Sequence, residues 1–277
     1  GSYSVGYRVS DASGNTTPLL SRTVIIENEA NIYVDISSGN DTTGNGTAGA
    51  PFGSIGKAMT MWSSQEFPVT VHVAAGTYNE SVTMTAWKTI EGPDPENPAA
   101  VFITSGASAV LTGAQGCALK NVCLVTTNYS GTPVLFDGHD TEPALVDHCE
   151  FRGNYNATAT GLLLVNTGES VPIIRYCRFR SIGTGIKALN TKARIAFCRF
   201  QDIDFYALVR PGSIEKESDP WLKDAFIFKD KEENLPVIGI LGEPDSGNNI
   251  FGNVQWKFVR NDNTERTLRA EVNDWGL

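Results

Sequence analysis

The chain has 277 residues and a formal net charge of −9, with 41% hydrophobic and 19% charged residues. This composition is typical of a globular protein and excludes an intrinsically disordered chain. No apolar run approaches the roughly 18 to 20 residues of a bilayer span, so we expect no membrane insertion. The acidic charge also argues against nucleic acid as a partner. The chain begins with Gly1 and has no leader, so we expect a fragment whose secretion signal lay upstream.

Two segments with alternating polarity, residues 3–9 and 21–26, flank the turn-forming stretch 11–15. They predict an antiparallel β-hairpin. Their sequence is similar to the closing hairpin of bacterial immunoglobulin-like repeats. The resemblance implies that residues 1–29 are the remnant of such a domain or a hairpin appendage. It also implies that other domains of a longer polypeptide are partners of this chain.

Residues 54–63 predict a short amphipathic helix, with Ser54 as its N-cap. Its apolar residues at helical spacing are Ile55, Ala58, Met59 and Trp62. The preceding stretch 37–50, rich in Gly, Asn and Thr, is interpreted as a loop. Oxygen ligands for calcium in and beside this loop are Asp35, Asn40 and Asp41. No acidic residue completes an EF-hand pattern, so a plain loop is favoured.

A short pattern recurs in residues 146–151, 174–179 and 195–200, and residues 119–124 form a weaker copy. Each copy alternates apolar and polar residues, as in a strand with one buried face. A repeat of twenty-odd residues built from short strands predicts a solenoid whose first coil the helix 54–63 would cap. The residues expected to stack inside it are Cys149, Cys177 and Cys198, and Phe151, Phe179 and Phe200.

Several motifs resemble right-handed parallel β-helix proteins of the pectin lyase-like superfamily. They lie at residues 32–35, 51–55, 71–80, 247–253 and 268–276. The resemblance spans residues 30–277 and implies an all-β fold, a right-handed parallel β-helix with a short N-terminal capping helix and a preceding hairpin. It also implies a secreted or cell-surface protein. It does not imply an activity, because the superfamily includes lyases, hydrolases, esterases, phage fibres and non-catalytic surface proteins.

The motif at residues 76–80 matches the opening of pectin methylesterases. Carried over by position, the two catalytic Asp residues of that family correspond to Asn156 and Thr184, and its substrate-binding Arg corresponds to Glu243. An amide cannot transfer the proton that a carboxyl group transfers, and Glu reverses the charge that binds substrate. We therefore predict that the chain is not a pectin methylesterase.

The richest acidic cluster comprises Asp137, Asp140, Glu142 and Asp147. A pectate lyase-like enzyme would use clustered carboxylates to hold calcium and a Lys or Arg as base. The favoured interpretation is a solvated turn. His139 and His148 are too far apart in sequence to indicate a metal site, so no metal ligands are assigned and calcium is the one cofactor left open.

The charge is uneven, because residues 149–200 contain 8 Lys and Arg against 2 Asp and Glu. If the Cys residues stack, one outward column contains Glu150, Arg178 and Arg199, and a second contains Arg152, Arg180 and Gln201. Guanidinium groups bind carboxylates and sulfates in bidentate fashion, so the candidate binding residues are Glu150, Arg152, Arg178, Arg180 and Arg199. The alternative is that these charges keep the sheet soluble and pair with one another.

The sequence thus predicts a non-catalytic, secreted or cell-surface β-helix that binds a polysaccharide or cell-surface glycan, or serves as an adhesin or spacer. The alternative is a polysaccharide-degrading enzyme, pectate lyase-like or a glycoside hydrolase, that acts on an acidic polysaccharide.

Overall fold

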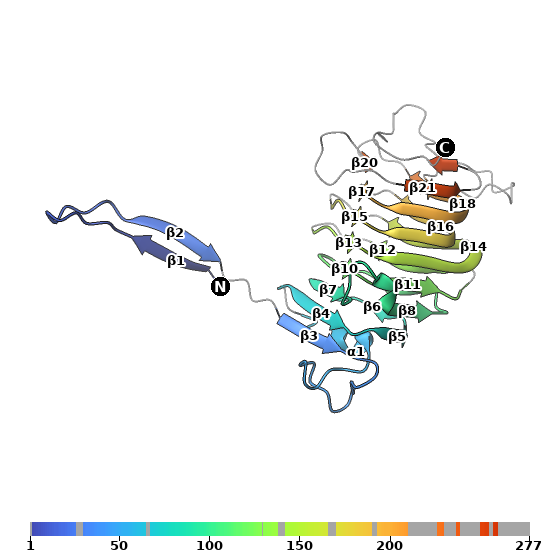
Figure 1. Cartoon of the computed structure of the whole chain (residues 1–277), viewed down its shortest axis with the longest axis horizontal. Coiled ribbons are helices and arrows are strands. Elements are labelled where there is room, and N and C mark those ends of the chain that lie inside the picture. The colour runs from blue at the N-terminus through green and yellow to red at the C-terminus, as the bar shows by residue number, and fades with distance from the viewer. Residues whose placement is uncertain are drawn as a thin grey trace.

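The computed structural model describes residues 2–25, 30–64, 67–128, 130–137, 142–165, 170–189 and 193–209. It also describes the strand segments 226–229, 237–238, 250–254 and 257–259. From residue 30 onward these residues coil into the solenoid of Figure 1, in which strands from successive coils stack in parallel. Most coils present strands on three faces, whereas the first coil contributes one strand and helix α1 (Ile55–Thr60).

The first face is an eight-stranded parallel sheet. Its strands are β3 (Ala30–Val34), β4 (Val69–Val73), β7 (Lys88–Glu91), β10 (Ala118–Lys120), β13 (Leu145–Asp147), β15 (Ile173–Arg175), β17 (Arg194–Ala196) and β20 (Val237–Ile238). The second face begins after a short corner in most coils. Its strands are β5 (Gly76–Asn79), β8 (Val101–Ser105), β11 (Cys123–Thr126), β14 (Glu150–Val165), β16 (Arg178–Leu189), β18 (Arg199–Val209) and β21 (Ile250–Val254).

The third face combines short strands with the distal parts of the long strands β14 and β16, which bend around the coil. Its short strands are β6 (Val82–Thr83), β9 (Ala109–Thr112), β12 (Thr132–Asp137) and β19 (Phe226–Lys229), and β22 (Lys257–Val259) pairs with the end of β18. Three parallel faces joined by successive turns form a right-handed parallel β-helix, as the sequence predicts.

The interior confirms the predicted stacks. The ring centroids of Phe151 and Phe179 lie 4.7 Å apart, those of Phe179 and Phe200 lie 4.9 Å apart, and the rings are nearly parallel. Cys149, Cys177 and Cys198 are buried free thiols. Burial raises the pKa of Cys149 and of Cys177 well above the ordinary value, so these thiols are small apolar groups of the core.

Helix α1 (Ile55–Thr60) covers the first coil and packs against β3, β4 and β6. The Ser54 hydroxyl accepts a hydrogen bond from the Lys57 amide at 3.2 Å, which confirms the predicted N-cap. The Glu80 carboxylate accepts hydrogen bonds from the amides of Ile55 and Gly56, at 2.9 and 2.8 Å. It thereby satisfies two of the amides that a helix N-terminus leaves unpaired.

The helix ends earlier than predicted. Met61 is its C-cap, and Trp62 follows in the left-handed region with φ 48°. The Trp62 side chain is therefore 42% exposed rather than buried with the helix face. Behind the helix, the buried Lys88 donates from Nζ to Thr85 Oγ1 at 2.6 Å and to the Trp62 carbonyl at 3.4 Å. Burial lowers the pKa of Lys88.

The loop before the helix satisfies its carboxylates internally. Asp41 accepts hydrogen bonds from the amides of Gly53 and Ser54 and from the Ser54 hydroxyl. Asp35 accepts from Ser38 and Ser37, and these hydrogen bonds lower its pKa to about 2. The geometry is that of the plain loop favoured by the sequence.

Strands β1 (Ser2–Tyr7) and β2 (Leu20–Ile25) form the predicted antiparallel hairpin, and in the described residues they pair only with each other. Asp11 stabilises the connecting turn by accepting hydrogen bonds from the amides of Ser13 and Asn15. Within the described residues, no helix has the length and apolar character needed to cross a membrane.

Candidate functional site

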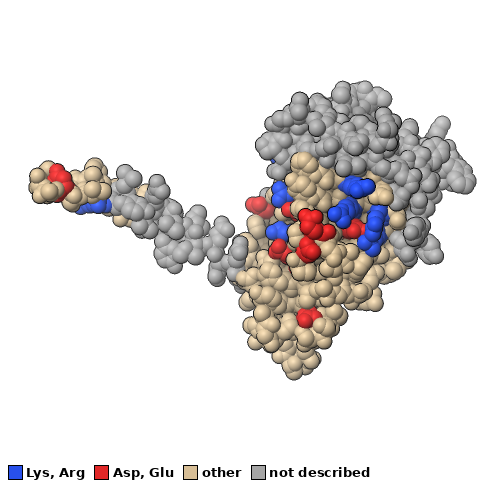
Figure 2. Space-filling model, viewed as in Figure 1, with Lys and Arg blue, Asp and Glu red and all other residues tan. Residues whose placement is uncertain are grey.

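The strand register confirms the two predicted columns on the second face. Glu150 lies opposite Arg178, which lies opposite Arg199; two residues later, Arg152 lies opposite Arg180 and Arg180 opposite Gln201. Neighbouring members of a column are therefore one strand spacing apart, about 4.8 Å. Figure 2 shows that charged side chains gather over the middle of the described solenoid, whereas its N-terminal coils are nearly uncharged on this side.

Glu150 differs from the prediction, because its side chain is buried rather than exposed to solvent. Its Oε1 forms ion pairs with Nε of Arg152 and, at 2.5 Å, with Nε of Arg180. The Arg152 guanidinium also lies over the Phe102 ring, 5.1 Å from its centroid. Three of the five candidate binding residues thus form an ion-pair cluster in which two guanidinium groups share one buried carboxylate.

Arg178 and Arg199 are the remaining pair of candidate residues. Both are exposed, and they are direct register neighbours in β16 and β18. In the described part of the chain, neither guanidinium forms an ion pair with a carboxylate. Two adjacent cations on a sheet repel each other, so this pair favours an external anion.

An exposed column of aromatic rings runs beside these arginines at the corner between the first and second faces. The His148 and Tyr176 ring centroids lie 4.7 Å apart, and those of Tyr176 and Phe197 lie 4.9 Å apart. Tyr176 and Phe197 are 43% and 42% exposed. All three residues occupy the left-handed region, with φ between 51° and 53°, which is unfavourable for bulky side chains.

This aromatic column is not among the features predicted from the sequence. Its signal is visible in the repeats, because each aromatic residue directly precedes a Cys of the inner stack. Asn121 takes the same corner conformation in the preceding coil, with φ 58°. The left-handed corner turns the chain so that the Cys points inward and the preceding ring points outward.

The connection between the first and second faces is longer in the coil that begins with β7. Strand β10 is separated from β11 by two residues, whereas β7 is separated from β8 by residues 92–100, here called the corner loop. Asn121 Nδ2 donates to the Gly92 carbonyl at 3.1 Å and fixes the start of this loop. A Cβ atom on Gly92 would lie 2.1 Å from the Asn121 carbonyl oxygen, so glycine is required there.

A hollow of about 240 Å³, here called the corner hollow, is lined by the corner loop, the aromatic column and the arginine pair. It is lined by Pro95, Glu96, Pro98, His148, Tyr176, Cys177, Arg178, Phe197 and Arg199. The corner loop follows β7, whereas the other lining residues follow β13, β15 and β17. A loop of one coil therefore lies beside residues from three later coils. Here two of the predicted binding residues, Arg178 and Arg199, lie beside the aromatic column and the corner loop, which the sequence did not predict.

The acidic residues of the alternative prediction belong to different faces. Asp147, on the first face, binds Nη2 of Arg175 at 3.0 Å and Nδ1 of His148 at 2.7 Å. Asp137 is exposed at the end of β12 on the third face, Glu142 is exposed between β12 and β13, and Asp140 lies outside the described residues. Among the residues that the structure describes, no three His, Cys, Asp or Glu side chains are arranged to hold a metal ion.

The residues compared with the methylesterase site are only partly described. Asn156 lies opposite Ile182 in the register, and Thr184 lies opposite Thr160, so the two are not direct neighbours. The Asn156 side chain and the whole of Glu243 lie outside the described residues. The absence of methylesterase activity stays a prediction.

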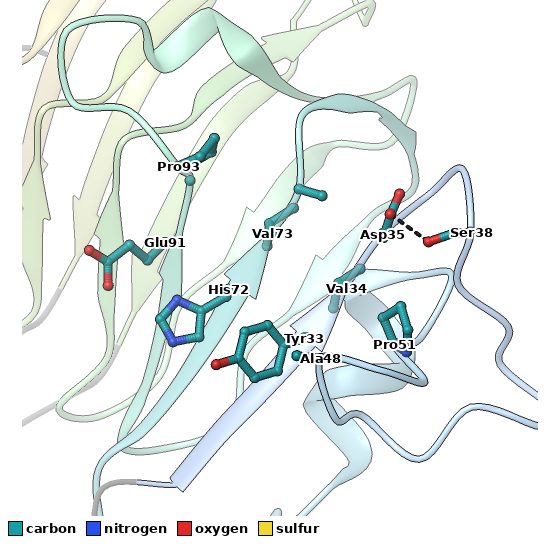
Figure 3. Close-up of a pocket in the computed structure, with 12 residues that line it drawn as sticks. Tyr33, Val34, Asp35, Ser38, Ala48, Pro51, His72, Val73, Glu91 and Pro93 are labelled. Atoms are coloured by element: carbon teal, nitrogen blue, oxygen red, sulfur yellow. Dashed lines mark hydrogen bonds between the residues drawn. The ribbon is translucent and has the colours of Figure 1, made fainter.

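A second hollow, of about 440 Å³, lies on the first face near the N-terminal cap (Figure 3). The Tyr33 and His72 rings stack there with centroids 5.0 Å apart, and Nε2 of His72 lies 2.8 Å from Oδ1 of Asn31. Asp35 and Glu91 also line this hollow, and the hydrogen bond from Ser38 holds Asp35 against the loop. This hollow has acidic residues where the corner hollow has arginines.

The chain is similar to a family model and to solved structures of a known enzyme. Residues 37–86 match a family model described as "Protein of unknown function (DUF1565)", which covers the loop, helix α1 and the Glu80 contact. No curated protein matches the chain. The crystal structure of pectin methylesterase from Aspergillus niger in deglycosylated form is similar over 84% of this chain and 81% of its own, with 16% identity and a TM-score of 0.50.

A second structure of the same Aspergillus niger enzyme, in penultimately deglycosylated form, has the same identity and coverage and a TM-score of 0.49. At 16% identity the likeness to the deglycosylated enzyme shows the parallel β-helix fold alone.

Proposed function

We propose that the chain is a non-catalytic β-helix module of a secreted or cell-surface protein and that it binds an acidic glycan. The observation that carries the proposal is the pair Arg178 and Arg199, which are exposed register neighbours without a carboxylate partner in the described residues. A glycan with carboxylates or sulfates supplies the missing counter-charge and gains from several weak contacts at once.

The similarity of fold to a pectin methylesterase supports a role on carbohydrate, because that enzyme acts on a carbohydrate polymer. A parallel β-helix presents long flat faces along which a polymer can lie. The charge of the chain adds to this support. A cationic patch on a protein of net charge −9 is a local feature, and local features of this kind guide charged ligands to one face.

A glycoside hydrolase, one form of the alternative, requires two carboxyl groups within reach of one sugar ring. In the described residues, Glu150 is paired with Arg152 and Arg180, and Asp147 with Arg175. These two carboxylates have structural partners, which favours binding over hydrolysis by either of them.

The test is binding to a panel of acidic and neutral polysaccharides at low and at physiological salt. We expect binding to at least one polyuronate or sulfated glycan, and we expect it to weaken at higher salt, because screening acts over about 8 to 10 Å there. The double variant Arg178→Ala/Arg199→Ala should lose most of this binding.

The matched control is Arg194→Ala, which removes an exposed arginine from β17 on the first face. It lowers the net charge as either single variant does but leaves the arginine pair intact. Equal binding by the double variant and the wild type would refute the proposal, as would the absence of binding to every acidic glycan at low salt.

A further inference from the structure

We propose that the corner hollow binds a single sugar unit that carries one negative charge. This inference rests on the proposed function and names the part of the glycan that the arginine pair recognises. It assigns a role to the aromatic column and to the corner loop, neither of which the arginine columns alone require.

The charges that line the hollow favour a ligand with one negative charge. Arg178 and Arg199 bring two positive charges to the hollow, and Glu96 on the corner loop brings one negative charge. The described residues show no ion pair between Glu96 and either arginine. One singly charged group between the arginines leaves the hollow neutral. A second anion within the hollow would meet the Glu96 carboxylate, so the hollow itself favours one charged group.

The central ring of the aromatic column presents its edge to the hollow. Tyr176 has a stacked neighbour on each face, His148 on one side and Phe197 on the other. Only the ring edge of Tyr176 can therefore line the hollow. Ring edges carry partial positive charge, whereas ring faces are negative. Tyr176 thus offers an electropositive edge to oxygen atoms and does not offer a flat face to the C–H side of a sugar.

The volume of the hollow favours a small ligand. It is about 240 Å³, below the roughly 300 to 1,000 Å³ of sites that enclose drug-sized ligands. Pro95 and Pro98 of the corner loop contribute to its lining together with the aromatic column. A hollow of this size fits one sugar ring.

Two kinds of sugar share this chemistry, a hexuronate and a sulfated hexose, and the ligands of the experiment separate them. Calorimetric titrations would use the methyl glycoside of galacturonic acid, its methyl ester, galactose 6-sulfate and galactose. We expect the hexuronate, the sulfated sugar or both to bind. We expect the neutral ester and galactose to bind at least 10-fold more weakly, because they lack the charge-assisted hydrogen bonds.

The variants test the individual groups. Arg178→Ala and Arg199→Ala should each weaken binding of the charged unit about 10-fold, the size of one charge-assisted contact. Glu96→Gln should strengthen it about 2- to 5-fold at low salt, since it removes a repulsive charge at the rim. The control variant Arg194→Ala should stay within 2-fold of the wild type.

The failures of the two proposals are distinguishable. If an acidic polymer binds in an arginine-dependent manner while no single charged unit binds, the corner hollow is not a subsite for one unit and the proposed function stands. Equal binding of the charged sugar and its neutral ester also overturns the inference. If neither single units nor any acidic polymer binds, both proposals fail.

Discussion

The first and second faces of the solenoid each bring charged residues into outward columns, but the sequence of positive and negative charges differs between the two columns. On the first face the column runs Glu91, Lys120, Asp147 and Arg175, so that each charge lies beside one of opposite sign. On the second face the column runs Glu150, Arg178 and Arg199, and its last two members have the same sign.

The difference shows that coil stacking alone does not pair the charges of a column. Stacking sets every column at the same spacing, and in a column of alternating sign neighbouring charges can pair, as Asp147 and Arg175 do. In a column that repeats one sign, neighbouring charges repel each other.

The largest loss of stability is expected when the ion-pair cluster around Glu150 on the second face is broken. Glu150→Ala removes a buried carboxylate and leaves Arg152 and Arg180 without their partner. Breaking a buried ion pair costs about 3–5 kcal/mol, and the partial exposure of both arginines reduces this to about 2–3 kcal/mol. The free energy of unfolding from urea denaturation measures the loss. The exposed Glu142→Ala serves as control, and an equal effect of both variants would contradict the buried cluster.

A buried cation extends the comparison to the interior. Lys88 has a lowered pKa because of its burial, so the folded protein releases this proton at lower pH than the unfolded chain. The free energy of unfolding contributed by Lys88 should therefore rise with pH in the window that ends near the ordinary value of 10.5. One proton limits the slope to about 1.4 kcal/mol per pH unit. Lys88→Met should lose this rise, and identical pH profiles for variant and wild type would contradict a perturbed Lys88.

The smallest effect on stability is expected at the arginine pair itself. Arg199→Glu gives the second face the alternating signs of the first, since Arg178 would then lie between two acidic side chains in its column. Relief of the repulsion should leave the free energy of unfolding unchanged or raise it by about 0.5 kcal/mol. Binding of acidic glycans should disappear. Thermal unfolding and glycan titration test both effects, with Arg194→Glu as control, and a loss of more than about 1 kcal/mol would show that Arg199 has a structural partner.

Much of the fold was readable in the sequence, because a solenoid repeats one local pattern. The spacing of Cys149, Cys177 and Cys198 predicted their stack, and the alternation around them predicted which residues share a column. The N-cap Ser54 was likewise a local signal. The end of the helix was not a local signal, because the left-handed conformation of Trp62 depends on the path that the chain takes after the helix.

The repeat, the inner stacks and the membership of the charged columns follow from sequence periodicity, because residues one coil apart must come into register. Which of these charges are paired depends on the tertiary structure. Glu150 is buried because two arginines from adjacent positions close over it, and the corner loop reaches residues several coils away. Contacts between columns and across coils depend on side-chain packing and loop path, and no periodicity in the chain encodes either of them.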